Sequence, residues 1–316
     1  MNNVFDLIAV GNATVDLFLT IHDENKHFHL NEEKELCVKY ADKILVDNAK
    51  FLLGGNACNV AVGLKRLGFK TAIVAEIGQD EFSKKIMNGL KKEEVDDSLI
   101  IKSNNEISPF SIILNYKKER TIFSENTEKD HDFDFKDFSS NFIYLTSLGK
   151  KWMDAYDKTL DFAKRKNAKI IFNPGTPQID AGENHISKIL ENTDILIVNK
   201  EEAEKIVNTD KEAMKDLLRR LKEHGPRIVA ITDGLNGAYC IDENEQIYYQ
   251  PITEAEIVER TGAGDSFSSG FVAALMHKKT IKEAMHWGSH NAASVVRKVG
   301  AQQGLLKKLE MEELLK

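Results

Sequence analysis

The chain has 316 residues, 42% of them hydrophobic and 29% charged, with a formal net charge of −7, which is typical of a globular protein with a sizeable core. Charges of both signs are mixed without a basic block, so a nucleic-acid partner is not expected. No apolar run approaches the roughly 20 residues that span a bilayer, and residues 1–6 lack a signal-peptide pattern, so no membrane association is expected. The three cysteines, Cys37, Cys58 and Cys240, are widely spaced and favour a reducing, cytoplasmic location.

Short apolar runs alternate with amphipathic stretches along most of the chain. This alternation predicts a mostly parallel central sheet flanked by helices. The predicted strands are 7–10, 71–75, 142–145, 170–172, 195–198 and 228–231. The predicted helices are 57–67, 82–90, 152–165, 201–207, 213–223 and one that begins near residue 263. For the first of these helices, Asn56 is the expected N-cap and Gly68 the expected stop.

Two regions, 14–43 and 109–123, interrupt this alternation with extended, partly alternating patterns. Neither region is large or apolar enough to form an independent domain. We therefore expect a single domain, 1–316, in which the two regions form a small antiparallel sheet that serves as a lid. Ordinary surface hairpins are the alternative interpretation.

The most informative local feature is the turn Gly262-Ala263-Gly264-Asp265, which an apolar helical stretch follows. Glycines let the backbone approach a ligand, and a helix N-terminus offers unpaired N–H groups and a partial positive charge that suit a phosphate. An aspartate on this turn is placed to accept a proton from an attacking hydroxyl group. The competing interpretation is a tight loop in which Asp265 only caps the helix.

Other residues, in two segments near the N-terminus, also fit a ligand crevice. Asn12 and Asp16 follow the first predicted strand, and the carboxyl ends of such strands face the crevice of a doubly wound sheet. Gly54-Gly55 permits close backbone contact with a polyhydroxylated ligand, and Asn59 lies one helical turn further on. The structural alternatives are a loop carboxylate that caps its own backbone at Asp16 and a surface amide at Asn59.

Together these motifs resemble the ribokinase-like (PfkB) family of carbohydrate and nucleoside kinases, from Gly11 to about Gln302. The C-terminal signature is matched at Thr261, Gly262, Ala263, Gly264, Asp265 and Phe267. The N-terminal signature is matched at Gly54, Gly55, Asn59, Leu67 and Gly68. Two further motifs are similar to family motifs at Asn199 and Glu202 and at Thr232, Gly234 and Gly237.

The resemblance implies a three-layer α/β/α sandwich with a small β-sheet lid, and ATP- and Mg²⁺-dependent transfer of the γ-phosphate to a hydroxymethyl group. It implies Asp265 as general base, with the amides of Gly262, Ala263, Gly264 and Asp265 as the anion hole. The implied substrate-binding residues are Asn12, Asp16, Gly54, Gly55, Asn56, Asn59 and Arg120. The implied nucleotide-binding residues are Asn199, Thr232, Gly234, Gly237, Gly262 and Gly264. Glu202 is the implied Mg²⁺ residue, and this role is favoured over the alternative that Glu202 lines an exposed acidic helix face. For Arg120, a solvated lid arginine is an equal alternative.

Several alternatives stay open at this point. Glu259 and Arg260 replace the aspartate and threonine that are usual in the family, which makes K⁺ activation doubtful. A sugar acceptor is favoured, but a nucleoside kinase is the alternative, with a base slot from Phe18, Phe28, Phe110 and Phe123. A non-catalytic ligand sensor is a further reading. The turn after the first strand is not Gly-x-Gly-x-x-Gly, which argues against a dinucleotide-dependent oxidoreductase. A homodimer through the lid is a further expectation from the resemblance.

Overall fold

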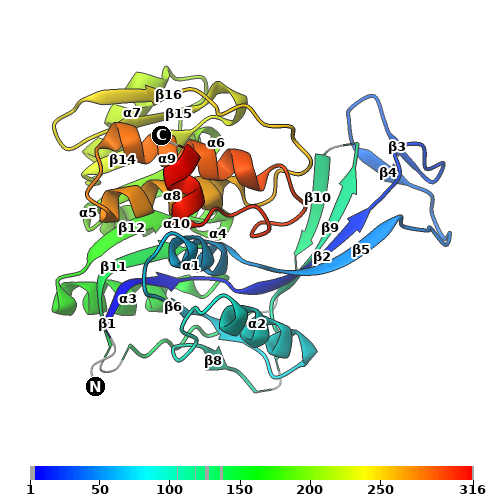
Figure 1. Ribbon diagram of the computed structural model, residues 1–316, viewed down its shortest axis with the longest axis horizontal. Coiled ribbons are helices and arrows are strands. Elements are labelled where there is room, and N and C mark those ends of the chain that lie inside the picture. The colour runs from blue at the N-terminus through cyan, green and yellow to red at the C-terminus, as the bar shows by residue number, and fades with distance from the viewer. Residues whose placement is uncertain (1–3, 105, 118, 125–127, 136–137, 315–316) are drawn as a thin grey trace.

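The computed structural model describes residues 4–104, 106–117, 119–124, 128–135 and 138–314, and the structural statements below concern these residues. Its main body is an eight-stranded sheet between two layers of helices (Figure 1). The strands of this sheet are β1 (Val4–Val10), β6 (Thr71–Val74), β11 (Ser139–Thr146), β12 (Lys169–Asn173), β13 (Ile195–Asn199), β14 (Ile228–Thr232), β15 (Ala238–Ile241) and β16 (Ile247–Gln250). All the strands predicted for this sheet are present.

The sheet is parallel from β6 to β14 and antiparallel at one edge. The strand order is β16-β15-β14-β13-β12-β11-β1-β6, and the pairs β14–β15 and β15–β16 are antiparallel. In the parallel part, Val10 at the end of β1 pairs with Val74 of β6 and Leu145 of β11. The carboxyl ends of the parallel strands therefore meet at one edge, where the site described below is found.

The helices cover both faces of the sheet because side chains of each buried strand point alternately to the two sides. In β1, Leu7 and Ala9 belong to one apolar cluster, whereas Ile8 and Val10 belong to the other. The helices are α1 (Asn56–Arg66), α2 (Glu81–Lys92), α3 (Trp152–Lys166), α4 (Thr176–Asp180), α5 (Glu183–Glu191), α6 (Lys200–Ile206), α7 (Met214–Glu223), α8 (Ala263–Met276), α9 (Ile281–Val295) and α10 (Lys308–Leu314), with a 3₁₀ turn η1 (Gly234–Asn236). Helices α1, α8 and α9 pack on the first cluster, and α3, α6 and α7 pack on the second. None of the described helices is long and apolar enough to cross a membrane.

The start of α1 differs from the prediction. The N-cap is Gly55, with φ 91°, and no side chain caps this end, so the prediction that Asn56 is the N-cap was wrong. The Asn56 side chain instead donates a hydrogen bond to Asp265, 209 positions later in the chain. The end of the helix is as predicted, because Gly68 follows it with φ 101°.

A second, four-stranded sheet projects from the body (Figure 1). Its strands are β2 (Thr14–Thr20), β5 (Asn48–Gly54), β9 (Phe110–Tyr116) and β10 (Glu119–Ser124), in the order β10-β9-β2-β5. We call it the lid sheet, although its movement stays a prediction. It differs from the expected sheet in two ways: β5 lies outside the range 14–43, and β2 pairs with β9 in parallel, so the sheet is mixed rather than antiparallel.

Short strands form two further two-stranded sheets. One pairs β3 (Phe28–Leu30) with β4 (Leu36–Val38), and the other pairs β7 (Glu76–Ile77) with β8 (Ile101–Lys102). Where the lid sheet joins the body, the buried Lys129 ammonium donates a hydrogen bond to the carbonyl of Ile107 at 2.8 Å and pairs with the Glu106 carboxylate at 3.3 Å. The backbone N–H of His131 donates to Glu76 at 2.7 Å. The chain that enters β9 and the chain that leaves β10 are therefore fastened to each other and to the body.

Candidate active site

The glycine-rich turn forms the N-terminal end of α8. Gly262 is the N-cap residue in the left-handed region, with φ 81°, and a Cβ at this position would lie 2.4 Å from the Cβ of Ala301. Both the conformation and the close contact therefore require glycine. Gly264, in contrast, has no atom within 4 Å of the place where a Cβ would lie, so its side of the turn is open to a ligand.

Most of the amides that were predicted to bind an anion are available. The Ala263 N–H donates to the carbonyl of Arg260 at 3.3 Å, and this amide is engaged within the protein. The next amide engaged is that of Ser266, which donates to the carbonyl of Gly262 at 2.9 Å. Within the part of the chain that the structure describes, the amides of Gly262, Gly264 and Asp265 have no protein acceptor. Unpaired amides at a helix N-terminus can bind a phosphate.

The Asp265 carboxyl group is half-buried and is held by two amide side chains of α1. Asn56 donates to one oxygen at 3.2 Å, and Asn59 donates to the other at 2.8 Å. Asn59 is itself fixed, because the buried Gln302 donates to its amide oxygen at 2.8 Å. This last bond leaves the Asn59 NH₂ group, and not its oxygen, directed at Asp265.

Burial raises the pKa of Asp265 from 3.8 to about 7, although the hydrogen bonds from Asn59 and Asn56 act in the opposite direction. The negative charges of Glu202 and Asp16 also raise the pKa of Asp265. A carboxyl group with a pKa near neutrality is suited to accept and return a proton.

Asp16 lies on β2 of the lid sheet and is 6% exposed. Thr14 donates its hydroxyl to Asp16 at 2.9 Å, and Ser111 of β9 also donates a hydrogen bond to the carboxylate. Burial raises the pKa of Asp16 to about 6 despite these bonds. This carboxylate is the reason that position 54 requires glycine, because a Cβ on Gly54 would lie 2.0 Å from the Asp16 Oδ2 atom.

Gly55 is required for a related reason. Its φ is 91°, and a Cβ there would lie 2.4 Å from the carbonyl oxygen of Asn12. The sequence interpretation was that Gly54-Gly55 permits contact with a ligand. In the structure, the two glycines make room for the Asp16 carboxylate and the Asn12 backbone.

Asn199 and Glu202 form a reciprocal cap at the start of α6. The Asn199 side chain accepts from the Glu202 backbone N–H at 2.9 Å, and the Glu202 carboxylate accepts from the Asn199 backbone N–H at 2.9 Å. This cap is a structural role that the sequence analysis did not weigh for Glu202. Burial and the nearby Glu201 charge raise the pKa of Glu202, so a cation beside its second oxygen would be favourable.

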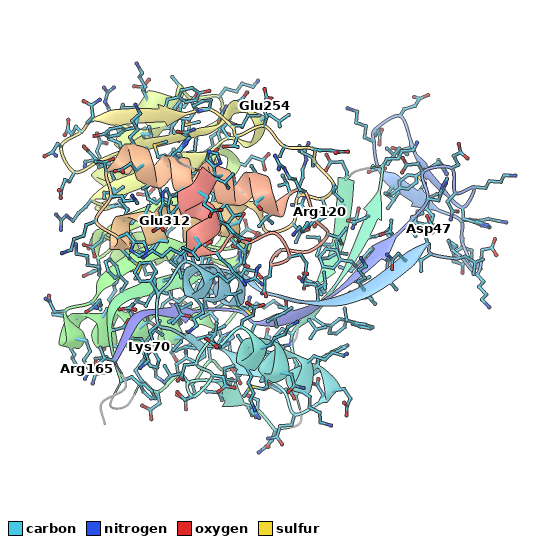
Figure 2. All side chains as sticks on the ribbon, in the orientation of Figure 1. Asp47, Lys70, Arg120, Arg165, Glu254 and Glu312 are labelled. Atoms are coloured by element: carbon cyan, nitrogen blue, oxygen red, sulfur yellow. The ribbon has the colours of Figure 1, made fainter. Side chains whose placement is uncertain are left out.

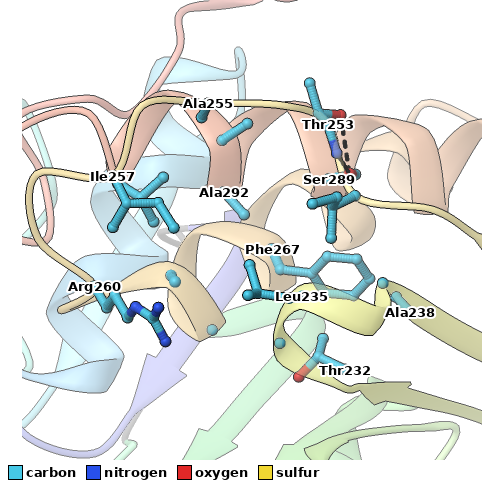
Figure 3. Close-up of a pocket in the computed structure, with 17 residues that line it drawn as sticks. Thr232, Leu235, Ala238, Thr253, Ala255, Ile257, Arg260, Phe267, Ser289 and Ala292 are labelled. Atoms are coloured by element: carbon cyan, nitrogen blue, oxygen red, sulfur yellow. Dashed lines mark hydrogen bonds between the residues drawn. The ribbon is translucent and has the colours of Figure 1, made fainter.

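A cavity of about 240 Å³ lies beside the turn (Figure 3). Four of the predicted nucleotide-binding residues line it: Thr232, Gly234, Gly237 and Gly264. Most of its other lining residues are apolar: Leu235, Ala238, Ile252, Ala255, Ile257, Ala263, Phe267, Ala292, Ala293 and Val296. The hydroxyl groups of Thr253 and Ser289, which also line it, are hydrogen-bonded to each other at 2.9 Å, as the dashed line shows. This arrangement suits a flat, largely apolar group at one end and an anion at the other.

Arg120 is not placed with the other predicted acceptor residues. It is exposed on β10, where the lid sheet faces the body (Figure 2), and lines a second cavity of about 150 Å³. Glu259 and Arg260 line the same cavity. The buried Glu259 carboxylate accepts hydrogen bonds from the backbone and hydroxyl of Thr261 and from the Gly300 N–H.

Sequence reasoning missed Gln302 as the residue that fixes Asn59, and it missed the apolar lining from the loop 251–257. Neither had a local sequence signal. Ser289 of α9 lines the cavity. Asn291 is buried and hydrogen-bonds Ser266, Ser269 and Leu306, which is a packing role.

Comparisons with known proteins agree with this architecture. Residues 21–308 match the model of the pfkB family carbohydrate kinases. An uncharacterized sugar kinase of Archaeoglobus fulgidus is 28% identical over 77% of this chain and 98% of that protein. The 5-dehydro-2-deoxygluconokinase of Bacillus subtilis is 24% identical over 98% of this chain and 96% of that protein.

A solved structure supports the fold. The nucleoside kinase of Methanocaldococcus jannaschii, described as an archaeal member of the ribokinase family, superposes with a TM-score of 0.77 at 22% identity, covering 98% of each chain. The predicted ribokinase-like α/β fold is therefore confirmed.

Proposed function

The chain belongs to the pfkB family of carbohydrate kinases, phosphotransferases with an alcohol group as acceptor, and on this premise we propose its reaction. It transfers the γ-phosphoryl group of ATP to a hydroxymethyl group of a small sugar or sugar-like substrate. The observation that carries this proposal is the Asp265 carboxyl group, with a pKa of about 7, beside three amides that have no acceptor among the described residues.

Asp265 takes the proton from the acceptor hydroxyl. The hydroxyl oxygen then forms a bond to the γ-phosphorus, and the bond from this phosphorus to the bridging oxygen of ADP breaks. The amides of Gly262, Gly264 and Asp265 donate hydrogen bonds to the negative charge on the transferred group. Asn56 and Asn59 hold the Asp265 carboxyl group in position. This increases the reaction rate because the base does not have to reorient before it accepts the proton.

The acceptor is held by Asp16 on the lid sheet, together with Asn12 and the amide side chains at the start of α1. A buried carboxylate can accept two hydrogen bonds from adjacent sugar hydroxyls, and Thr14 and Ser111 fix its orientation. Closure of the lid sheet over the acceptor would exclude water and limit ATP hydrolysis.

The nucleotide occupies the 240 Å³ cavity, with the base against its apolar lining and the phosphates at the turn. Asn199, Thr232, Gly234 and Gly237 border the phosphates and ribose. The donor set fits Mg²⁺, because Glu202 is a partly buried carboxylate of raised pKa with one oxygen outside the helix cap. Mg²⁺ would supply positive charge to the phosphate oxygens.

The Glu259 carboxylate already has donors from Thr261 and Gly300, so a monovalent cation is not needed to satisfy it. We therefore propose that activity does not depend on K⁺. A titration of activity with KCl at constant ionic strength tests this point.

Among acceptors, a sugar or sugar acid is favoured over a nucleoside. Of the aromatic residues considered for a base slot, Phe18 and Phe28 are buried in apolar packing, and the Phe28 ring lies against Tyr116 with ring centroids 5.8 Å apart. Phe110 packs on Phe82 with ring centroids 5.4 Å apart, and Phe123 is 58% exposed. The nucleoside alternative therefore rests on Phe110 and Phe123 and on the likeness to a nucleoside kinase structure.

Two experiments test the proposal. A screen of ATP consumption with ribose, fructose, ketodeoxygluconate, 5-dehydro-2-deoxygluconate, adenosine, inosine and cytidine identifies the acceptor class. Asp265→Asn should then lower kcat by about 10²–10⁴-fold with that acceptor, the usual contribution of a general base. Phosphoryl transfer within about tenfold of the unmodified protein would exclude Asp265 as the base.

A further inference from the structure

Arg260 lies at the junction of the two cavities. It directly precedes the glycine-rich turn and lines both the 240 Å³ cavity and the 150 Å³ cavity below the lid sheet. Of the described residues that line the larger cavity, Arg260 is the one with a charged side chain. Figure 3 shows it on the opposite side of the cavity from the Thr253–Ser289 pair.

The guanidinium group of Arg260 is available to a ligand. Its ion pair is with Glu119 of β10, at 3.8 Å, and the two side chains are 43% and 67% exposed. An exposed pair at this separation is screened by water and contributes little. A phosphate group, which carries more charge and presents two oxygens to the guanidinium fork, is a stronger partner.

The negative charges of the site make a positively charged side chain favourable for nucleotide binding. The negative charges of Glu202 and Asp16 raise the pKa of Asp265, and that of Glu259 raises the pKa of Asp16. A nucleotide polyphosphate brought into this region meets repulsion from these charges. The turn amides offer only partial positive charge, so a full positive charge next to the turn offsets the repulsion.

We propose that the Arg260 guanidinium binds the β- and γ-phosphates of the donor nucleotide. It thereby makes the site selective for nucleoside di- and triphosphates over monophosphates. The inference rests on the proposed function, because it places the nucleotide in the larger cavity. It assigns a specificity role to a residue at which this chain departs from the usual family pattern. The side chain reaches the phosphates from the lid side, and the turn amides reach them from the start of α8.

The test compares ligands that differ only in the phosphate chain. Dissociation constants for ADP and AMP are measured by calorimetry at constant Mg²⁺ and ionic strength, for the unmodified protein, Arg260→Gln and Arg260→Lys. Arg219→Gln, an exposed arginine of α7 paired with Asp216, is the matched control. AMP carries the base and ribose but lacks the phosphates that reach the turn.

For Arg260→Gln, ADP should bind about ten- to hundredfold more weakly, as expected for a hydrogen bond between charged groups, with AMP changed by less than about twofold. The dissociation constant of ADP for Arg260→Lys should lie between the values for the unmodified protein and Arg260→Gln, because lysine keeps the positive charge but not the forked guanidinium group. Equal weakening of ADP and AMP, or unchanged ADP binding, would overturn the inference. If the unmodified protein binds neither nucleotide, the proposed function itself fails.

Discussion

Removing the charge of Asp265 should stabilise the fold at alkaline pH while it abolishes the proposed proton transfer. The pKa of this carboxyl group is about 7 in the folded protein and 3.8 in a model compound. A group whose pKa is raised by folding stabilises the fold when it is protonated. Its contribution is complete below about pH 4 and is lost as the pH rises through about 7.

The size of the effect follows from the two pKa values. A difference of about 3 units corresponds to about 4 kcal/mol between the extremes, since one unit is worth about 1.4 kcal/mol. Between about pH 8 and about pH 5 the linkage relation gives roughly 2–3 kcal/mol. The Asn side chain is neutral at both pH values. The difference in free energy of unfolding between Asp265→Asn and the unmodified protein should therefore shrink by this amount as the pH falls from about 8 to about 5.

The free energy of unfolding is measured by urea titration followed by circular dichroism at both pH values, for the unmodified protein and Asp265→Asn. Any change in the hydrogen bonds from Asn56 and Asn59 that does not depend on pH cancels in the comparison. Asp161→Asn, at an exposed position of α3, is the matched control. A stability difference that is the same at both pH values within about 0.5 kcal/mol would refute the assignment of a raised pKa to Asp265.

Three other substitutions probe the supporting residues. Gly54→Ala places a methyl group 2.0 Å from the Asp16 carboxylate, and the acceptor KM should rise at least about tenfold while ATP binding is unchanged. Gln302→Leu removes the donor that fixes Asn59, so kcat should fall about tenfold and the acid limb of its pH profile should move to higher pH. Glu202→Gln keeps the helix cap through its amide oxygen, so the unfolding temperature should stay the same while the half-saturating Mg²⁺ concentration rises about tenfold.

Each of these results has a counterpart that would contradict it. An unchanged acceptor KM in Gly54→Ala would mean that Asp16 does not hold the acceptor. A kcat loss in Gln302→Leu without movement of the acid limb would point to general disruption and not to the loss of orientation at Asn59. A lower unfolding temperature in Glu202→Gln, with the Mg²⁺ requirement unchanged, would leave the carboxylate with its capping role alone.

The parts of the fold that were predictable have strong local patterns. The buried strands of the main sheet are short apolar runs, and Gly68, predicted as the stop of the first helix, follows that helix with a positive φ. The strand Asn48–Gly54 was missed because its first four residues are exposed, so it has no regular alternation of burial. The parallel pairing of β2 with β9 joins segments about 95 residues apart, as in Thr20 with Asn115, and no local pattern encodes it.

The same distinction applies to the site. Asp265 could be predicted as a candidate base because its glycine neighbours and the following helix are adjacent in sequence. The bond from Gln302 to Asn59 joins residues 243 positions apart, and a lone glutamine carries no signal of such a role. The apolar lining of the cavity comes from a loop and a helix that only the folded chain brings together.

The two key carboxylates belong to different parts of the molecule. Asp16 is carried by a strand of the projecting sheet, whereas Asp265 is carried by a helix of the three-layered body. Any rotation between these parts changes the separation of the two carboxyl groups directly. In the proposed reaction, the hold on the acceptor is therefore coupled to the alignment of the reacting hydroxyl, and a molecule too small or too large to let the two parts meet is expected to bind without being phosphorylated.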